Sequence, residues 1–178
     1  MYQVGDLILY ESSGVCKVMD VSMRDLAGEN KEQLCYVLEP LYQNYTIFTL
    51  VNTTKVFMRP IISKNEAEEL IDEIQTVQAR AYHNRVLRQL TQHYDALLKT
   101  HDCSDLVELT LSLHAKKQGM EQQKRKFGAV DERFMKRADE LLFGELAAAL
   151  DIPINRVPGY IADRANEKRS DNENGFNA

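Results

Sequence analysis

Hydrophobic residues follow two different spacings along the chain, and the change falls near residue 62. Up to that point, short runs rich in Val, Ile, Tyr, Phe and Thr alternate with turn residues such as Ser12-Ser13-Gly14, a pattern typical of β-strands. We expect five strands, at residues 3–10, 14–21, 34–39, 45–51 and 55–59. Five short strands in so small a segment predict a closed or nearly closed barrel of SH3 or Tudor type, because closure removes exposed sheet edges.

From residue 63 onward the spacing is helical. Ser63 and Glu66 have the spacing of a capping box, in which each side chain binds the other's backbone amide. Apolar residues then recur every three or four positions over 70–77 and 86–98, which fits either one bent helix or two. Further helices are expected from Ser104 to about Gln118 with Gly119 as C-cap, from Asp131 as N-cap, and within residues 152–164.

The two spacings together predict a β + α two-domain protein. Residues 1–62 would form the five-stranded SH3- or Tudor-like barrel, and residues 63–165 an all-helical bundle. The last stretch, residues 166–178 (NEKRSDNENGFNA), is polar throughout. Such a composition buries too little apolar surface to fold, so we expect a disordered tail.

Charge is distributed unevenly between these parts. The whole chain carries a net charge of −5, which is unlike a general nucleic-acid coat. Residues 80–137, however, contain twelve Lys or Arg against seven Asp or Glu, a local balance of 12 − 7 = +5. Packed as a bundle, these helices could present a basic face suited to phosphate contacts. A solvated face balanced by nearby acids would have the same composition.

Patterns typical of enzymes and metal sites are missing from the sequence. Its four histidines are scattered, and His101 with Cys103 supplies only two of the three or four ligands that a metal site needs. No nucleophile elbow, phosphate-binding glycine loop or zinc-protease motif occurs. Three separated cysteines and the lack of a leader or an apolar span fit a reduced, cytoplasmic protein. We therefore expect no enzyme activity, no cofactor, no metal and no membrane.

Several short motifs occur in an order that resembles a known family. The resemblance rests on residues 4–10 (VGDLILY), 14–15, 28–29, 56–59, 83–85 (HNR), 132–133, 138 and 144–147 (GELA). In this order, over roughly residues 1–150, the chain resembles the CarD-like bacterial transcription regulators. Its N-terminal part also resembles the RNA polymerase-interacting domain of transcription–repair coupling factors.

The resemblance implies partners and contact residues. In that family the barrel binds the β subunit of RNA polymerase, and the helical domain contacts promoter DNA and stabilises the open complex. Arg24 falls where the family has a basic polymerase-contacting residue, Thr49 falls near the position of a second one, and Arg59 ends the last strand. The family's tryptophan wedge is absent, since the chain has no Trp. The DNA-contacting residues we expect are Tyr82, His83, Arg85, Arg88, Lys124, Arg125 and Lys126.

The sequence thus predicts a non-enzymatic, cytoplasmic transcription regulator. Its barrel would bind the RNA polymerase β subunit, and its helical domain would contact promoter DNA without sequence specificity. An alternative is a protein–protein adaptor that binds polymerase or another partner and makes no DNA contact. The net charge and the missing tryptophan favour the alternative.

Overall fold

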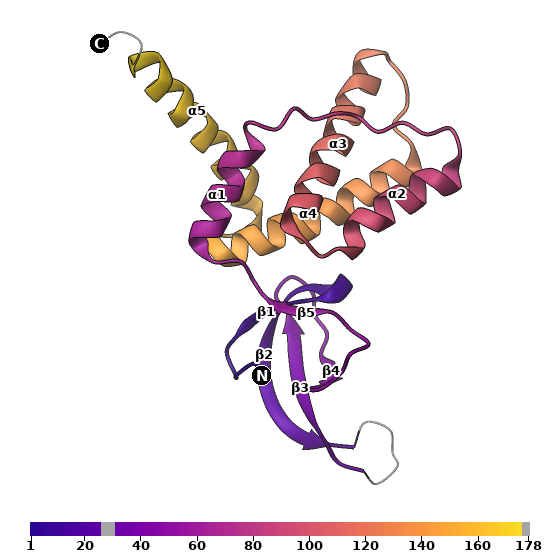
Figure 1. Ribbon diagram of the computed structural model, residues 1–178, viewed down its shortest axis with the longest axis vertical. Helices are drawn as coiled ribbons and strands as arrows, with labels where there is room; N and C mark the ends of the chain where they lie inside the picture. Colours follow the sequence, from indigo (N-terminus) through magenta and orange to yellow (C-terminus); the bar gives the residue numbers. More distant parts are fainter. Residues whose placement is uncertain (26–30, 176–178) are drawn as a thin grey trace. The chain divides into compact units, whose positions relative to one another are not determined.

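A computed structural model describes residues 1–25 and 31–175 of the chain (Figure 1). Residues 28–29, one of the motifs on which the family resemblance rests, lie outside these described residues. The chain divides into two compact units, Met1–Ile62 and Ser63–Ala178. Strands make up the first unit and helices the second, and each unit is described below by itself.

The first unit contains an antiparallel five-stranded sheet, as the sequence predicted. Its strands follow the order β4-β3-β2-β1-β5 across the sheet. A short 3₁₀ turn, Glu11–Ser13, joins the first two strands. The strands are β1 (Leu7–Tyr10), β2 (Gly14–Arg24), β3 (Gln33–Pro40), β4 (Ile47–Leu50) and β5 (Met58–Pro60).

The predicted barrel closure is not observed. β4 and β5 are the two outer strands of the sheet, and no pairing joins them among the described residues. Both strands are short, of four and three residues. Because these outer strands are short, few of their backbone N–H and C=O groups are left unpaired. The open sheet therefore has only short exposed edges.

A β-bulge in β2 determines which side chains face the core. Val18 pairs with Leu38 and Asp20 pairs with Val37, so Met19 is an extra residue without a partner on β3. The extra residue shifts the alternation of β2, and Val21 therefore lies on the same face as Val18. That face carries the core, whose buried members are Ile8, Cys16, Val18, Tyr36 and Leu38.

In the second unit, the helical stretch after residue 63 contains two helices rather than one. α1 (Lys64–Ile74) begins with the predicted capping box of Ser63 and Glu66, which is confirmed. α2 (Leu87–Lys99) follows a non-helical segment. This segment is diverted from a helix because the Tyr82 N–H donates to Ser112 Oγ at 3.1 Å and Asn84 Oδ1 accepts from the Val86 N–H at 2.8 Å.

α3 (Cys103–Gln122) and α4 (Ala129–Leu150) form the main helix pair of this unit. Two predicted ends were wrong. Gly119 lies inside α3, and the left-handed residue after α3 is Lys124, with φ of 54°. α4 begins after Gly128, so Asp131 lies in its first turn instead of capping it. The Asp131 carboxylate is buried against other helices, which accounts for the difference.

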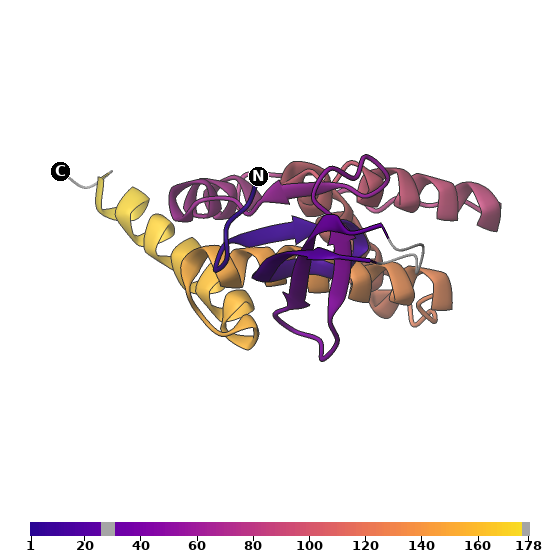
Figure 2. The same cartoon turned by 90° about the horizontal axis from the view of Figure 1, so that it is seen from below.

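Much of the predicted disordered tail is helical, and its last residues, 176–178, lie outside the described residues. After the short turn Ile154–Arg156, α5 (Val157–Gly175) continues well past residue 166. The helix is anchored near its start, where Val157 is buried and Arg164 binds Asp72 of α1. Ala165 and Glu167 are good helix formers that can extend it. Figure 2 shows its later turns extending beyond the other helices.

Candidate functional site

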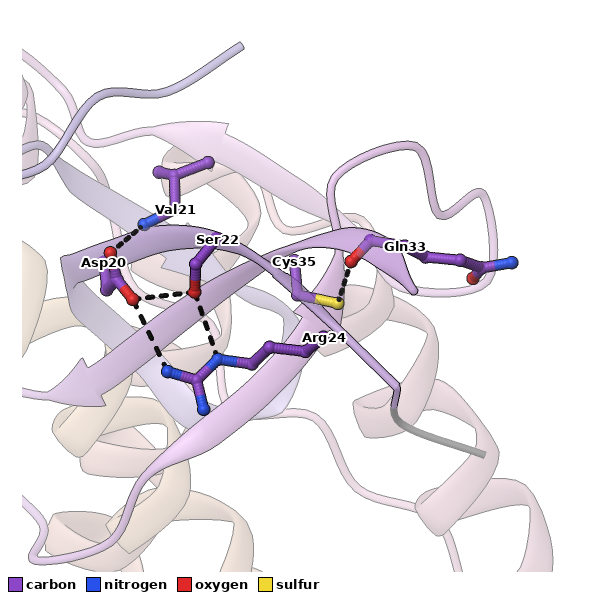
Figure 3. A network of polar contacts seen from close by, with 6 residues as sticks. All are labelled: Asp20, Val21, Ser22, Arg24, Gln33 and Cys35. Atoms are coloured by element: carbon purple, nitrogen blue, oxygen red, sulfur yellow. Dashed lines mark hydrogen bonds and ion pairs between the residues drawn. The ribbon is translucent and has the colours of Figure 1, made fainter. Parts of the chain in front are cut away.

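The predicted polymerase-contacting residue Arg24 lies at the end of β2, on the face opposite the core. A ladder of polar contacts fixes its guanidinium (Figure 3). Arg24 Nε donates to Ser22 Oγ at 3.1 Å, Ser22 Oγ donates to Asp20 Oδ2 at 2.7 Å, and Arg24 Nη2 lies 3.4 Å from that same oxygen. The hydrogen bond from Ser22, together with the Val21 N–H and Arg24, lowers the pKa of Asp20. The ladder therefore holds an exposed cation in one place.

Phe48 lies next to this cation. The Arg24 guanidinium carbon is 5.1 Å from the centre of the Phe48 ring, a cation–π distance. Phe48 is 47% exposed although it lies within β4. Val37 pairs with both Asp20 and Phe48, which places these three residues in one row across β2, β3 and β4. We call Asp20, Ser22, Arg24 and Phe48 the Arg24 surface.

The structure does not support a surface contact by Thr49. Its side chain points to the core face of β4 and is only 6% exposed, because strand residues alternate between faces and Phe48 takes the outward position. Phe48 is a surface residue that the sequence pattern does not predict. An aromatic residue in a strand ordinarily indicates core, and only the register with β3 reveals that this one faces outward.

Arg59 does not join the Arg24 surface through strand pairing. It lies on β5 and pairs with Leu9 of β1, at the opposite side of the sheet from β4. One of its guanidinium nitrogens donates to the Pro60 carbonyl at 3.0 Å. Its predicted polymerase contact therefore belongs to a different part of the sheet and stays a prediction.

In the helical unit, four predicted DNA-contacting residues come together around one concavity of about 680 Å³. His83 and Arg85 approach it from the segment before α2, and Arg125 and Lys126 from the loop between α3 and α4. All four side chains are exposed. We call this concavity the basic groove.

Buried polar side chains form the floor of the basic groove. Lys116 Nζ lies 2.8 Å from Asp131 Oδ1, and both side chains are less than a tenth exposed. The Tyr94 hydroxyl donates to the same oxygen at 2.8 Å and accepts from Lys116 at 3.3 Å. Burial, and then the bond to Asp131, raises the pKa of Tyr94 far above its ordinary value. The buried charges are thus paired and hydrogen-bonded.

Tyr82 has a structural role beside the groove. Its ring stacks on His93 with centroids 3.8 Å apart, and meets Tyr94 edge-on at 6.2 Å. The ring is half-buried against the core of α2, α3 and α4. As placed here, Tyr82 is a packing residue, and its predicted contact with DNA would require it to leave this stack.

The two remaining predicted residues lie outside the groove lining. Arg88 is exposed in the first turn of α2. Lys124 occupies the left-handed position after α3, and the next residue's N–H, that of Arg125, donates to the Met120 carbonyl at 2.8 Å. This is the arrangement of a Schellman C-cap, which fixes the direction of the following loop.

The described residues show neither a metal cluster nor a membrane span. Residues 1–25 and 31–175 contain no group of three His, Cys, Asp or Glu side chains placed to hold a metal ion. Within the same residues, no helix combines the length and the apolar character that crossing a membrane requires.

Comparison with known proteins identifies the first unit. Residues 2–62 match the CarD-like/TRCF RID domain family. The match covers almost the whole first unit, Met1–Ile62, and about a third of the chain. No curated protein matches the sequence.

Proposed function

Because residues 2–62 are a CarD-like/TRCF RID module, we propose that this protein is a non-enzymatic transcription regulator that binds the β subunit of RNA polymerase. The family match is the observation that carries the proposal. In this module the long, bulged β2 pairs with β1 at one end and with β3 along its length.

The Arg24 surface is the proposed contact with polymerase. Arg24 is a cation already fixed by Ser22 and Asp20, so ordering it on binding costs little side-chain entropy. Phe48 adds apolar area beside it, and aromatic and Arg side chains are the residue types that dominate protein interfaces. β4 is an outer strand, to which an extended segment of the partner could pair through backbone hydrogen bonds.

Capture of the polymerase β subunit tests this contact. Arg24→Glu reverses the fixed charge and should weaken capture by at least about tenfold, the loss expected for a charge-assisted contact. Lys17→Glu is the matched control, because Lys17 is exposed on the same strand but at its other end. Equal capture by wild type and Arg24→Glu would remove the Arg24 surface from the interface.

The second part of the proposal is that the helical unit contacts promoter DNA. This contact would take place in the cytoplasm. The convergence of Arg85, Arg125 and Lys126 supports it, since cations on one face suit backbone phosphates. Contacts made only with melted or bent DNA would favour that state by their differential affinity. A coupling of about 1–3 kcal/mol would change open-complex stability about five- to 150-fold.

A protein–protein adaptor without DNA contact is the alternative, and the net charge of −5 favours it. Salt titration of polymerase complexes on fork-junction DNA distinguishes the two functions. A regulator that neutralises phosphates makes the affinity fall more steeply with salt than polymerase alone does. If adding the protein leaves that slope unchanged, the adaptor is the correct function.

A further inference from the structure

The basic groove has the chemistry of an anion site, whichever macromolecule the helical unit meets. Among its lining residues are four cationic side chains, Arg85, Lys116, Arg125 and Lys126, and one carboxylate, Asp131. The cations come from three separate segments, so the fold and not a local sequence run brings them together. Lys116 and Asp131 neutralise each other, so the exposed charges of the groove are all positive. A concave surface whose exposed charges have one sign concentrates ions of the other sign.

Both walls of the groove are fixed before any ligand arrives. On one side, the Asn84 side chain donates to the Tyr82 hydroxyl and to Gln89 Oε1 at 3.3 and 3.0 Å. These bonds hold the turn that carries His83 and Arg85. On the other side, the C-cap of α3 fixes the loop that carries Arg125 and Lys126. A site fixed in this way loses little entropy when it binds.

The start of α4 already holds a carboxylate of the chain itself. Gly128 is the N-cap and supplies no side-chain cap, but Asp131 Oδ2 lies 3.0 Å from the position that a Cβ on Gly128 would take. Asp131 Oδ1 is engaged by Lys116 and Tyr94. The positive character of the groove therefore comes from its rim, because Lys116 and Asp131 neutralise each other.

We propose that the basic groove is a built phosphate-binding site. Phosphate oxygens would accept from Arg85, Arg125 and Lys126 at the rim, above a floor in which Lys116 and Asp131 neutralise each other. The phosphate could belong to a nucleic-acid backbone or to a free phosphorylated small molecule, because both present the same oxyanion. The inference goes beyond the proposed function, since it holds whether or not the protein contacts DNA.

Calorimetric titration of the full chain with inorganic pyrophosphate at low salt tests the site. We expect saturable binding that Lys126→Glu or Arg125→Glu weakens by about tenfold or more, as loss of a charge-assisted hydrogen bond predicts. Both residues are exposed, so these variants should fold. Lys136→Glu makes the same charge change on an α4 residue outside the groove, with a side chain 79% exposed, and should leave affinity within about twofold.

Two results would overturn the proposal. One is no saturable binding of pyrophosphate by the wild-type chain. The other is an equal loss in Lys136→Glu and Lys126→Glu, which would indicate a general charge effect and no site. Failure of DNA binding alone would leave the pyrophosphate result standing, so this inference and the proposed function can fail separately.

A competition arm identifies the source of the phosphate. If pyrophosphate displaces fork-junction DNA at the concentrations that fill the groove, the phosphate belongs to the DNA backbone. If pyrophosphate fills the groove without displacing DNA, or if DNA does not bind at all, the ligand is a free phosphorylated molecule. Both outcomes support the site.

Discussion

The buried pair under the basic groove gives the sharpest stability prediction. Asp131→Ala removes the acceptor of two hydrogen bonds of 2.8 Å, from Lys116 and Tyr94. It leaves Lys116, which is 5% exposed, as an unpaired charge in the interior. Breaking a buried ion pair in this way costs about 3–5 kcal/mol. That loss is a large share of the roughly 5–15 kcal/mol by which folded domains are stable.

Urea unfolding followed by circular dichroism at 222 nm measures this loss, because the helical unit dominates that signal. With a slope of roughly 2 kcal/mol per molar urea, the midpoint should fall by about 1.5–2.5 M. Asp139→Ala is the matched control. It removes another α4 carboxylate, which pairs with a half-exposed His114, and should cost less than about 1 kcal/mol.

A double variant shows whether the charge itself causes the loss. Lys116→Met in the Asp131→Ala background replaces the stranded ammonium with an apolar chain of similar length. It should regain part of the lost stability, since an apolar replacement of a buried pair is often neutral. A stabilising role for the buried ion pair would be refuted if Asp131→Ala costs no more than Asp139→Ala, or if the double variant is less stable than Asp131→Ala alone.

Three other predictions follow from single contacts. The hydrogen bond to Asp139 raises the pKa of His114. This contact should therefore stabilise the fold fully below pH of about 6.5 and lose its effect as pH rises through the higher folded pKa; Asp139→Asn should remove this dependence from urea midpoints. Phe48→Ala should weaken polymerase capture with little change in the midpoint, whereas Phe57→Ala, which removes a ring of similar exposure (41%), should leave capture unchanged. Arg164→Ala removes the two-pronged contact with Asp72 at 2.6 and 3.0 Å and should cost about 1 kcal/mol, with faster amide exchange confined to α5.

Local patterns were enough to predict much of the fold. Apolar runs separated by turns gave the five strands, and the Ser63–Glu66 spacing gave the start of α1. Features that depend on distant partners could not be predicted in this way. Asp131 has the chemistry of an N-cap, yet Lys116 and Tyr94 engage it as a buried acceptor. The break before α2 depends on Ser112 of α3, thirty residues away.

The residues of the candidate sites also fall into those that local sequence patterns predict and those that depend on distant partners. Charge counting along residues 80–137 indicated a basic region, but it could not separate Arg125 and Lys126, which line the groove, from Arg88, which does not. The resemblance led to Thr49, whereas the register of β4 against β3 buries Thr49 and exposes Phe48. A shift of one residue in the pairing register exchanges the two faces of a strand. The amino-acid composition of the strand does not reveal that register.

The bulge at Met19 therefore has a consequence for how this sequence can change over time. Substitutions at Met19 are readily accommodated, because the side chain has no partner on β3 and is 41% exposed. Loss of the residue would also keep the two faces. A single-codon deletion of Met19 leaves Val18 opposite Leu38 and Asp20 opposite Val37, so the later residues of β2 keep their faces and only the bulge is lost. Deletion of Ser22, in the regular part of the strand, would instead turn Arg24 toward the core face. We expect homologous modules to vary in the identity and in the presence of the bulge residue while keeping the number of residues from Asp20 to Arg24 constant.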